Sequence, residues 1–372
     1  MKRIGAALCL AGGLATSLGL AQTPNSDGGA FKLGTFEREG RTFIGVVVND
    51  SLVADLEQAN AAVAKQTPTA ARVTVPRDMK ELIAGYEQGG LRQRIAAIAA
   101  QVAAQPRPAY VYDLSALRIR PPVAPTTILN AAVNYVEHAN EMSRGAPPAG
   151  AAAARPADEP KSMPGMWERK PGDTRHNPYF FLKPTSVVIA SGEAIRLPPG
   201  RDRIDWECEL SVVVGRVASR VPVERADDYI FGYTLQNDVS DRGGRGDTRH
   251  GSDWLIGKGH DTFAPLGPFI VPKAHVPDPQ KMPIKFTLTG KVMQDSNTDR
   301  MTHNVREMLS FASHILTLQP GDILAMGSPA GVGAARGIFF KDGDVSVCTI
   351  GNIGTLTNPV KATSGSTPTA GR

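Results

Sequence analysis

The stretch IDWECELSVVVGRVASRVPVERADDYIFGYTLQND, residues Ile204–Asp238, decides how the rest of the sequence is interpreted. Its first part alternates polar and apolar residues and then turns fully apolar, which predicts a strand. Glu207 and Glu209 lie two residues apart and therefore share one face of that strand, while Cys208 points to the other face. A second predicted strand ends just before Asp238. The pattern thus places three carboxylates near strand ends.

Three carboxylates held close together repel one another unless a cation lies between them. Ligation by oxygen alone suits a hard divalent ion, so Glu207, Glu209 and Asp238 are the predicted ligands of Mg²⁺, Mn²⁺ or Ca²⁺. The alternative is a strand edge with two solvated glutamates, because Glu-x-Glu is a common pattern. Spacing alone does not decide between these interpretations.

Four further segments accompany this stretch. They are NYVEHANEM (Asn134–Met142), LIGKGHDTFAPLGPFIV (Leu255–Val271), QPGDILAMGSPAGVG (Gln319–Gly333) and GNIGTLTNPV (Gly351–Val360). In this order, and together with Ile204–Asp238, they resemble the fumarylacetoacetate hydrolase superfamily, in particular catalytic domains of the 2-oxo acid and acylpyruvate hydrolase type. The resemblance covers residues 128–360 and favours the metal interpretation of the carboxylates.

His138 and Glu141 are three residues apart in a predicted helical turn and therefore share one face. A carboxylate beside an imidazole raises its basicity and fixes its tautomer, which suits a base that takes a proton from water. Taken alone, such a pair is more often a surface pair. The resemblance implies a catalytic dyad, because relatives carry His and Glu in a matching segment. Some relatives have an additional Asp ligand where this sequence has Ala131, so three protein carboxylates are expected.

Other candidate site residues follow from the same resemblance. Lys258 lies between two glycines, which let the chain approach a ligand closely and aim the ammonium at developing negative charge. A loop rich in Gly and Ala exposes backbone N–H groups for a carboxylate or an oxyanion. The predicted catalytic residues are His138, Glu141 and Lys258, and the predicted substrate-binding residues are Lys183, Arg242, Arg245, Ser328 and Gly331. Many relatives have Gln in place of Arg245, which hints at an additional anionic group on the substrate.

The resemblance implies a divalent-metal-dependent hydrolase that cleaves a C–C bond in a 2-oxo acid or 1,3-dicarbonyl compound, such as a fumarylacetoacetate- or acylpyruvate-like substrate. Relatives usually bind Mg²⁺, and most are homodimers. One alternative is a decarboxylase or isomerase that acts on a 2-oxo or 2-hydroxydienoate acid through the same enolate. The other is an exported metal-dependent binding protein without turnover. The pairing of His138 with Glu141 argues against the latter, because a binding protein needs no water-activating base.

The expected fold is α+β, a mixed β-sheet sandwich or rolled barrel of the fumarylacetoacetase C-terminal type. Strand-like segments outnumber helices in 126–360, the predicted catalytic domain, and no βαβ alternation or dinucleotide fingerprint is present. Residues 31–120 are predicted to form a small N-terminal α+β domain. An Ala/Pro-rich insertion at 143–177 is either a surface insertion or a lid that orders over substrate. Residues 361–372 are predicted to be a disordered tail.

Two segments show clear helical periodicity. Asp78–Gln105 repeats apolar residues at helical spacing, with a break at Gly89-Gly90. Asn304–Thr317 carries a single apolar stripe, and Asn304 with Glu307 suits a capping box at its start. Both stripes are expected to face the core.

Composition sets the outer limits. The 372 residues suffice for one large domain or two smaller ones with a sizeable core. There are 41 Lys and Arg against 36 Asp and Glu, so the formal net charge is +5, but no dense basic run indicates nucleic-acid binding. The modest basic excess suits a small anionic substrate.

The first 21 residues resemble a secretory signal peptide. Lys2 and Arg3 precede an apolar stretch, and Gly19-Leu20-Ala21 fits a small-x-small cleavage site. An uncleaved anchor is the alternative. Residues 22–30 are then a disordered lead-in, and no later apolar run is long enough to span a membrane. The sequence therefore predicts a periplasmic or secreted protein.

Removal of the signal peptide takes Cys9 with it and leaves two cysteines in the mature chain, Cys208 and Cys348. Both lie in strand-like runs. An oxidising compartment permits a disulfide, yet nothing in the sequence brings the two residues together. We therefore predict a buried pair of free thiols.

The signal peptide yields the first testable prediction. Protein recovered from the periplasmic fraction should begin at Gln22, because cleavage follows the small-x-small site that ends at Ala21. Amino-terminal sequencing checks this directly. An intact Met1 on protein found in the cytosol would refute the assignment.

Overall fold

The computed structural model describes residues 29–66, 69, 72–104, 107–144, 160–247, 249 and 251–363. The predicted signal peptide at 1–21 lies outside these residues, as do most of the lead-in at 22–30 and most of the tail at 361–372. Residues 145–159 of the insertion also lie outside them. No helix in the described part of the chain is long and apolar enough to cross a membrane.

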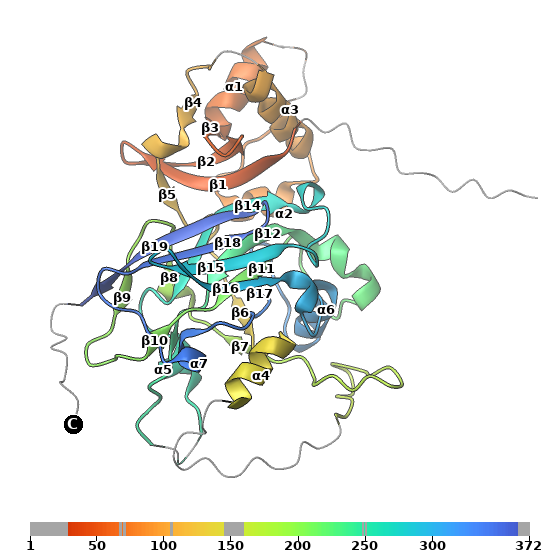
Figure 1. The fold of residues 1–372 in the computed structure, drawn as a ribbon. Helices are drawn as coiled ribbons and strands as arrows, with labels where there is room; N and C mark the ends of the chain where they lie inside the picture. The colour runs from red at the N-terminus through yellow and green to blue at the C-terminus, as the bar shows by residue number, and fades with distance from the viewer. Residues whose placement is uncertain are drawn as a thin grey trace, which may run out of the picture.

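The described chain is built mainly from strands. The helices are α1 (Leu56–Gln66), α2 (Met79–Gly85), α3 (Leu91–Ala104), α4 (Val136–Arg144), α5 (Trp254–Lys258), α6 (Val305–Ile315) and α7 (Gly333–Arg336). The strands are β1 (Phe31–Arg38), β2 (Arg41–Val48), β3 (Leu52–Asp55), β4 (Val111–Asp113), β5 (Arg118–Arg120), β6 (Ile128–Ala131), β7 (Phe180–Leu182), β8 (Val188–Ile189), β9 (Ile195–Leu197), β10 (Ile204–Asp205), β11 (Cys208–Val214), β12 (Ile230–Asn237), β13 (Ser240–Asp241), β14 (Ala264–Pro272), β15 (Pro283–Leu288), β16 (Lys291–Asn297), β17 (Ile323–Ala325), β18 (Val345–Ile350) and β19 (Gly354–Ala362). Figure 1 shows α1 and α3 at one end of the molecule and α4, α5 and α7 at the other.

One twelve-stranded sheet runs through both predicted domains. Its main path is β4-β3-β2-β1-β14-β12-β11-β17-β6-β7, with β5 beside β1 and β8 beside β14. Strand β1 pairs antiparallel with β14, where Leu33 lies opposite Ile270. The N-terminal hairpin therefore extends the sheet of the catalytic part, and strand pairing fixes the small N-terminal unit to it.

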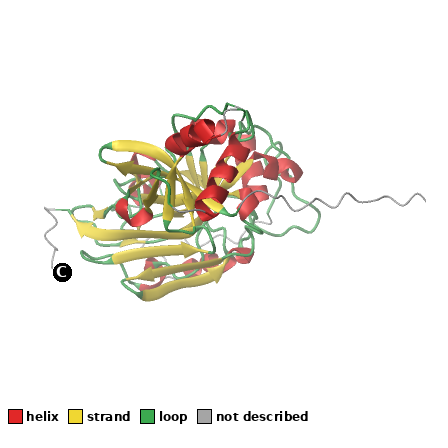
Figure 2. Cartoon of the chain, turned by 90° about the horizontal axis from the view of Figure 1, so that it is seen from above, coloured by secondary structure: helices red, strands yellow, loops and turns green. Residues whose placement is uncertain are grey.

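A five-stranded sheet, β16-β15-β18-β19-β9, packs against the large one. A buried apolar cluster fills the space between them, and in it the ring of Trp206 stacks on Phe286 with centroids 5.1 Å apart. Figure 2 shows the strands in layers with most of the helices gathered toward one side. The predicted α+β class with large mixed sheets is confirmed. Neither sheet closes into a barrel among the described strands, so of the two predicted forms the open, layered one is found.

The helical predictions are confirmed where periodicity was strong. The pattern at 78–105 forms α2 and α3, separated at Gly89 and Gly90, which both have positive φ. The pattern at 304–317 forms α6 with a complete capping box. Helix α1 was not expected. Of its residues only Leu56 and Ala59 are buried, so its apolar periodicity is too sparse to give a signal.

Cys208 and Cys348 form a disulfide bond, so the prediction of two free thiols was wrong. Cys208 begins β11 and Cys348 lies on β18, in the two facing sheets, and their Cα atoms are 5.6 Å apart. The residues are 140 positions apart in sequence, and only the packing of the sheets brings them together. Local sequence patterns carry no information about a contact of this kind.

Residues 160–177, the part of the insertion that follows the undescribed residues 145–159, are attached to the domain around α6. Arg175 forms ion pairs with Glu307 at 3.0 Å and with Asp173 at 2.9 Å. The buried ring of Trp167 meets His303 edge-on at 5.3 Å. This part of the insertion is thus fixed to the domain surface by charge and by packing.

The C-terminal boundary differs slightly from the predicted one. Strand β19 continues to Ala362, and its last residues pair in parallel with β9, with Lys361 opposite Arg196 and Ala362 opposite Leu197. These two residues therefore belong to the five-stranded sheet and not to the predicted tail.

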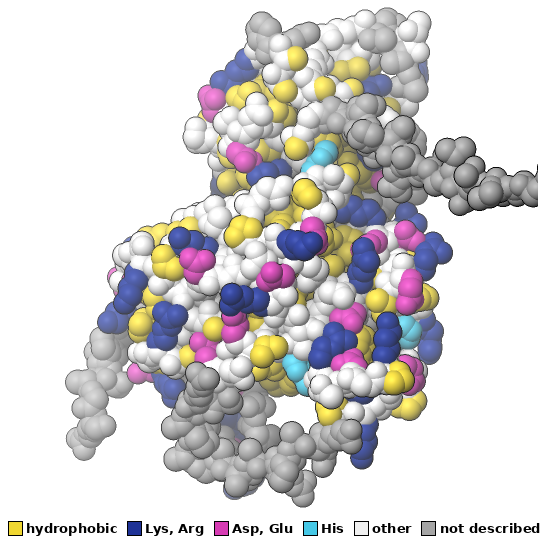
Figure 3. All heavy atoms as spheres, turned by 45° about the vertical axis from the view of Figure 1, so that its right-hand side comes forward, with side chains coloured by type: hydrophobic (Ala, Val, Ile, Leu, Met, Phe, Trp, Pro, Cys, Tyr) yellow, Lys and Arg dark blue, Asp and Glu magenta, His cyan; other side chains and the backbone are white. Residues whose placement is uncertain are grey.

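Charged side chains are dispersed over the surface. On the face shown in Figure 3, Lys and Arg side chains alternate with Asp and Glu side chains. Several exposed ion pairs are of this kind, such as Arg225 with Asp228 and Arg306 with Asp227. Exposed pairs contribute little to stability, roughly 0–1 kcal/mol each.

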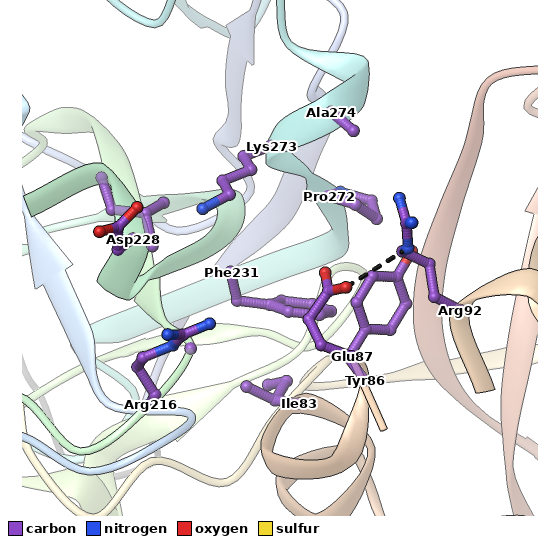
Figure 4. Close-up of a pocket in the computed structure, with 12 residues that line it drawn as sticks. Ile83, Tyr86, Glu87, Arg92, Arg216, Asp228, Phe231, Pro272, Lys273 and Ala274 are labelled. Atoms are coloured by element: carbon purple, nitrogen blue, oxygen red, sulfur yellow. Dashed lines mark ion pairs between the residues drawn. The ribbon is translucent and has the colours of Figure 1, made fainter. Parts of the chain in front are cut away.

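A pocket of about 260 Å³ lies where the small N-terminal unit meets the catalytic part. Tyr86 and Phe231 line the pocket, with their rings edge to face and the ring centroids 5.0 Å apart. Figure 4 shows Arg216 and Lys273 across the pocket from Glu87, which is paired with Arg92. The pocket marks the junction of the two units and contains none of the predicted site residues.

The capping box of α6 yields a stability prediction. The Asn304 side chain accepts from the N–H groups of Arg306 and Glu307, and the Glu307 carboxylate accepts from the Asn304 N–H. Asn304→Ala should lower the free energy of unfolding by about 1 kcal/mol, and Asn304→Asp, which keeps the acceptor, by less. Urea denaturation followed by circular dichroism measures both. Equal stability of the Ala variant and the wild type would show that the cap is dispensable.

Candidate active site

Three carboxylates meet where β11 begins and β12 ends. Glu209 lies on β11, Glu207 directly precedes that strand, and Asp238 directly follows β12. Because the strands pair antiparallel, with Glu209 opposite Gln236, the start of one lies beside the end of the other. One oxygen of each carboxylate lies within 4.8 Å of the others, and all three residues are buried. No other group of three metal-type ligands occurs within the described ranges.

Main-chain hydrogen bonds hold the carboxylates in place. The Asp238 N–H donates to the Glu207 carbonyl at 2.8 Å, and the Glu207 N–H donates to Asn237 Oδ1 at 3.0 Å. The Gly327 N–H donates to Glu209 Oε2 at 2.8 Å. The strand ends and the loop after β17 therefore fix the positions of these groups together.

Three cations from different parts of the chain face this cluster. Lys258 Nζ, at the end of α5, donates to Glu207 Oε2 at 2.8 Å and to Asp238 Oδ2 at 2.5 Å. Lys183 Nζ also donates to Asp238. Arg242 Nη2 donates to Glu207 Oε1 at 2.5 Å. The structure thus brings three of the predicted catalytic and substrate-binding residues to the carboxylates.

Burial and charge act against each other in this site. Burial favours a raised pKa for Glu207, but Lys258 and Arg242 outweigh it and hold that pKa well below its ordinary value. Burial and the neighbouring carboxylates raise the pKa of Glu209 well above its ordinary value. Burial also lowers the pKa of Lys183 to about 8. Of the three carboxylates, Glu209 is therefore the one whose negative charge is not offset by a hydrogen-bonded protein cation.

The residues present fit a hard divalent ion. Glu209 Oε1 is buried and has no hydrogen-bond partner in the described structure. A cation among the three carboxylates would satisfy that oxygen and offset their mutual repulsion. A donor set made only of oxygens favours Mg²⁺, Mn²⁺ or Ca²⁺ over softer metals.

The predicted dyad lies directly beside the cluster. His138, on α4, places Nδ1 2.9 Å from Glu141 Oε1 and Nε2 3.6 Å from Glu207 Oε1. Because an ionised carboxylate only accepts, Nδ1 carries the proton in the neutral ring and Nε2 carries the lone pair. The imidazole therefore presents a basic nitrogen toward the carboxylates.

The loop after β17 supports the dyad. The Gly331 N–H donates to both oxygens of Glu141, at 3.0 and 2.9 Å, and the Val332 N–H lies 3.4 Å from Oε1. Gly331 was predicted to bind substrate through its N–H, but here that N–H positions the dyad. Ser328 Oγ accepts from Gln294 Nε2 at 2.8 Å and is buried.

The structure does not bring the predicted residue Arg245 to the cluster. It lies in the loop between β13 and α5 and pairs with Asp247 at 3.0 Å. That partner is two residues away and exposed, so the contact is local. In this conformation the additional anion site suggested by the sequence is not assembled.

Two site residues were missed by the sequence interpretation. Asp205 is fully buried and accepts from Arg242 Nε and from the Ala334 N–H, both at 2.8 Å. Ser240 Oγ accepts from Lys258 Nζ at 2.7 Å. A signal for Asp205 was present, because it precedes Glu207 by the same two-residue step that separates Glu207 from Glu209. Ser240 had no comparable signal.

Comparison with known proteins places this arrangement in a family. The model of the fumarylacetoacetate (FAA) hydrolase C-terminal domain matches residues 127–361, which is more than half of the chain. The chain belongs to the fumarylacetoacetate hydrolase family. The family assignment made from the sequence motifs is thereby confirmed.

Fumarylacetoacetate hydrolase family proteins similar to this chain have several activities. The mitochondrial oxaloacetate tautomerase FAHD2A of Bos taurus is 32% identical over 291 residues, covering 77% of this chain and 81% of the relative. A structure of maleylpyruvate hydrolase from Sphingobium sp. SYK-6, in complex with manganese (II) and pyruvate, has a TM-score of 0.61 and 28% identity and covers 89% of this chain and 99% of that one. A 5-carboxymethyl-2-hydroxymuconate delta-isomerase from Mycobacterium smegmatis has a TM-score of 0.60 and 26% identity, with 90% and 99% covered.

The uncompensated oxygen of Glu209 yields a metal-binding prediction. Glu209→Gln should weaken Mn²⁺ binding by roughly 10- to 100-fold, because an anionic ligand becomes a neutral amide while the strand is kept. Isothermal titration of metal-free protein measures the change. Glu193→Gln, at a carboxylate that binds Arg118 outside the cluster, is the matched control and should bind Mn²⁺ like the wild type. Equal affinity of Glu209→Gln and the wild type would exclude Glu209 as a ligand.

Proposed function

We propose that this protein is a divalent-metal-dependent hydrolase that cleaves a C–C bond in a 2-oxo acid or 1,3-dicarbonyl substrate. The observation that carries the proposal is the position of His138. Its Nε2 faces the Glu207 carboxylate at 3.6 Å, while its Nδ1 is held by Glu141. A base oriented in this way beside a metal-type site suits proton transfer at a bound substrate.

The ion would be held by Glu207, Glu209 and Asp238. When bound, it supplies a Lewis acid that polarises substrate oxygens and stabilises negative charge on them. Mn²⁺ is a preferred candidate, because a similar protein with 28% identity has been solved with manganese (II) and pyruvate, and Mg²⁺ is the other, because the family resemblance implies it.

His138 would act on water. Nε2 takes a proton from the water whose oxygen forms a bond to the acyl carbon. The C–C bond then breaks, its electron pair leaves as an enolate, and the proton held at Nε2 passes to that fragment. Glu141 fixes the tautomer and stabilises the imidazolium, and the Gly331 N–H keeps Glu141 in place.

Lys258 and Arg242 would bind the anionic substrate and the enolate. Lys258 ends α5 with its ammonium against Glu207 and Asp238, and Arg242 reaches the opposite oxygen of Glu207. Charges held in a buried site interact more strongly than they would in water and need no reorganisation as charge develops. Release of these cations toward substrate is the expected response when an ion neutralises the carboxylates.

A second candidate function is supported by the relatives. Similar proteins include oxaloacetate tautomerases and an isomerase, which move a proton between carbon and oxygen. The same His138 serves such a reaction with substrate carbon in place of water, and a decarboxylase would use the same enolate. A substrate panel of maleylpyruvate, fumarylpyruvate, acylpyruvates and oxaloacetate separates hydrolysis, decarboxylation and enol–keto conversion. A binding protein without turnover would leave every compound unchanged.

We also propose that the protein is exported and acts as a homodimer. The predicted signal peptide supports export, and so does the Cys208–Cys348 disulfide, because disulfides persist in oxidising compartments. The homodimer rests on the resemblance alone, and light scattering of purified protein tests it.

The dyad yields a catalytic prediction. His138→Ala should lower kcat by roughly 10²- to 10⁴-fold, the usual contribution of a general base, and should leave Mn²⁺ affinity nearly unchanged. Glu141→Gln should lower kcat by less, because the imidazole remains. Steady-state kinetics on the most active panel compound, with metal titrations in parallel, gives both numbers.

The matched control for the dyad is His314→Ala. His314 lies on α6, outside the site, and its ring is hydrogen-bonded within its own helix, at the Ser310 carbonyl. It should keep wild-type kcat. Hydrolysis by His138→Ala at the wild-type rate would mean that the dyad is structural and that the proposed mechanism is wrong.

A further inference from the structure

The disulfide lies directly behind the carboxylate cluster. Cys208 is the residue between the two glutamates, and strand alternation sends its side chain to the opposite face, into the apolar core. There it is bonded to Cys348 on β18 of the five-stranded sheet. The segment that carries two of the three carboxylates is therefore covalently tied to the facing sheet.

A second tie joins the same strand ends to β18. Asn237, the last residue of β12, donates through Nδ2 to Ser346 Oγ at 3.1 Å and accepts the Glu207 N–H at Oδ1. Ser346 and Cys348 are two residues apart on β18 and thus lie on the same face. Both strands that meet at the carboxylate cluster are anchored to one short stretch of the other sheet.

The disulfide and the Asn237–Ser346 hydrogen bond each join two defined atoms, whereas the apolar packing around them does not. Apolar side chains fill much of the space between the sheets, and apolar packing is non-directional. The Cys208 N–H also donates to Gln294 Oε1 on β16 at 3.2 Å. A single neutral hydrogen bond contributes only about 0.5–1.5 kcal/mol. The disulfide is thus the covalent constraint that ties Cys208, and with it Glu207 and Glu209 on either side, to the facing sheet, in addition to these weaker hydrogen bonds.

We propose that Cys208 and Cys348 are positioning residues for the carboxylate cluster, and that high-affinity binding of the divalent ion requires their disulfide. The inference rests on the metal site of the proposed function and adds how that site is completed. In chemical terms, two cysteine thiols lose two electrons and two protons to a disulfide oxidant, such as oxidised glutathione, and the S–S bond forms. The metal centre then matures after oxidation.

The burial of both cysteines makes this a maturation step and not a rapid switch. Each residue has 0% exposure, so reductants in solution reach the bond only when the structure opens. The two thiols are accessible to an oxidant during folding, before the two sheets close over the sulfurs. An exported chain would meet an oxidising environment at that stage.

The experiment compares three forms of the chain that begins at Gln22. They are oxidised wild type, wild type folded in dithiothreitol to keep both thiols reduced, and the double variant Cys208→Ala/Cys348→Ala. Free thiols are counted in denaturant, folding is checked by circular dichroism, and Mn²⁺ affinity is measured by titration with electron paramagnetic resonance detection. The reduced wild type and the double variant should bind Mn²⁺ at least roughly 10-fold more weakly than the oxidised form, as expected when the support of a ligand is lost.

Two controls separate positioning from general stability. Ile350→Ala removes a fully buried side chain from the same strand, β18, and leaves the disulfide intact. It should lower thermal stability and keep the affinity of the oxidised wild type. Dithiothreitol should not change the affinity of the double variant, because that variant has no bond to reduce.

The outcomes are distinct. Equal Mn²⁺ affinity of oxidised and reduced folded wild type overturns the inference and leaves the metal site standing. Equal loss of affinity in Ile350→Ala assigns the effect to stability and also overturns it. Failure of the oxidised wild type to bind Mn²⁺ overturns the metal site, and with it the proposed function. If the double variant does not fold, the reduced wild type alone decides between these results.

Discussion

Repulsion among three buried carboxylates is the constraint on which the rest of the site depends. Two like charges about 4 Å apart repel by roughly 4 kcal/mol at an effective dielectric constant near 20, and burial adds a desolvation cost to each. Glu207, Glu209 and Asp238 lie within 4.8 Å of one another. A fold that keeps them together must supply positive charge at the same place. It does so with three cations drawn from separate segments of the catalytic part, of which Lys183 and Lys258 are buried and Arg242 is half-buried.

The protein cations offset the negative charges of the three carboxylates unequally. Lys258 and Arg242 bond to Glu207, and Lys183 and Lys258 bond to Asp238, so these carboxylates are matched by protein charge. Glu209 receives a single backbone N–H and keeps one oxygen without a partner. Such a group is stable in its ionised form only with an added cation. The structure thus contains its own argument for an ion, independent of the family to which the chain belongs.

The sequence predicted the parts of the molecule that depend on local periodicity. Alternation placed Glu207 and Glu209 on one face, and a three-residue step placed His138 beside Glu141. Helical spacing with a cap predicted α6. Contacts made only by the packing of distant segments were not predicted, such as the disulfide across the two sheets and the pairing of β1 with β14. The roles of single residues in loops were equally hidden, because nothing local distinguishes a Gly331 N–H that holds a carboxylate from one that meets a substrate.

In the proposed mechanism, hydrolysis and tautomerisation use the same site geometry. Glu141 bonds to His138 and to the loop after β17, and this arrangement orients the imidazole with its Nε2 toward Glu207. The group that gives its proton to Nε2 is then either a water molecule or the acidic carbon of the substrate. With an acyl group that can accept water beside the enolisable carbon, the proton transfer leads to C–C cleavage. With oxaloacetate no such group is present, and the same transfer interconverts enol and keto forms. Under the proposed mechanism, one dyad beside one carboxylate cluster can therefore serve either reaction, and the structure of the substrate decides which one follows.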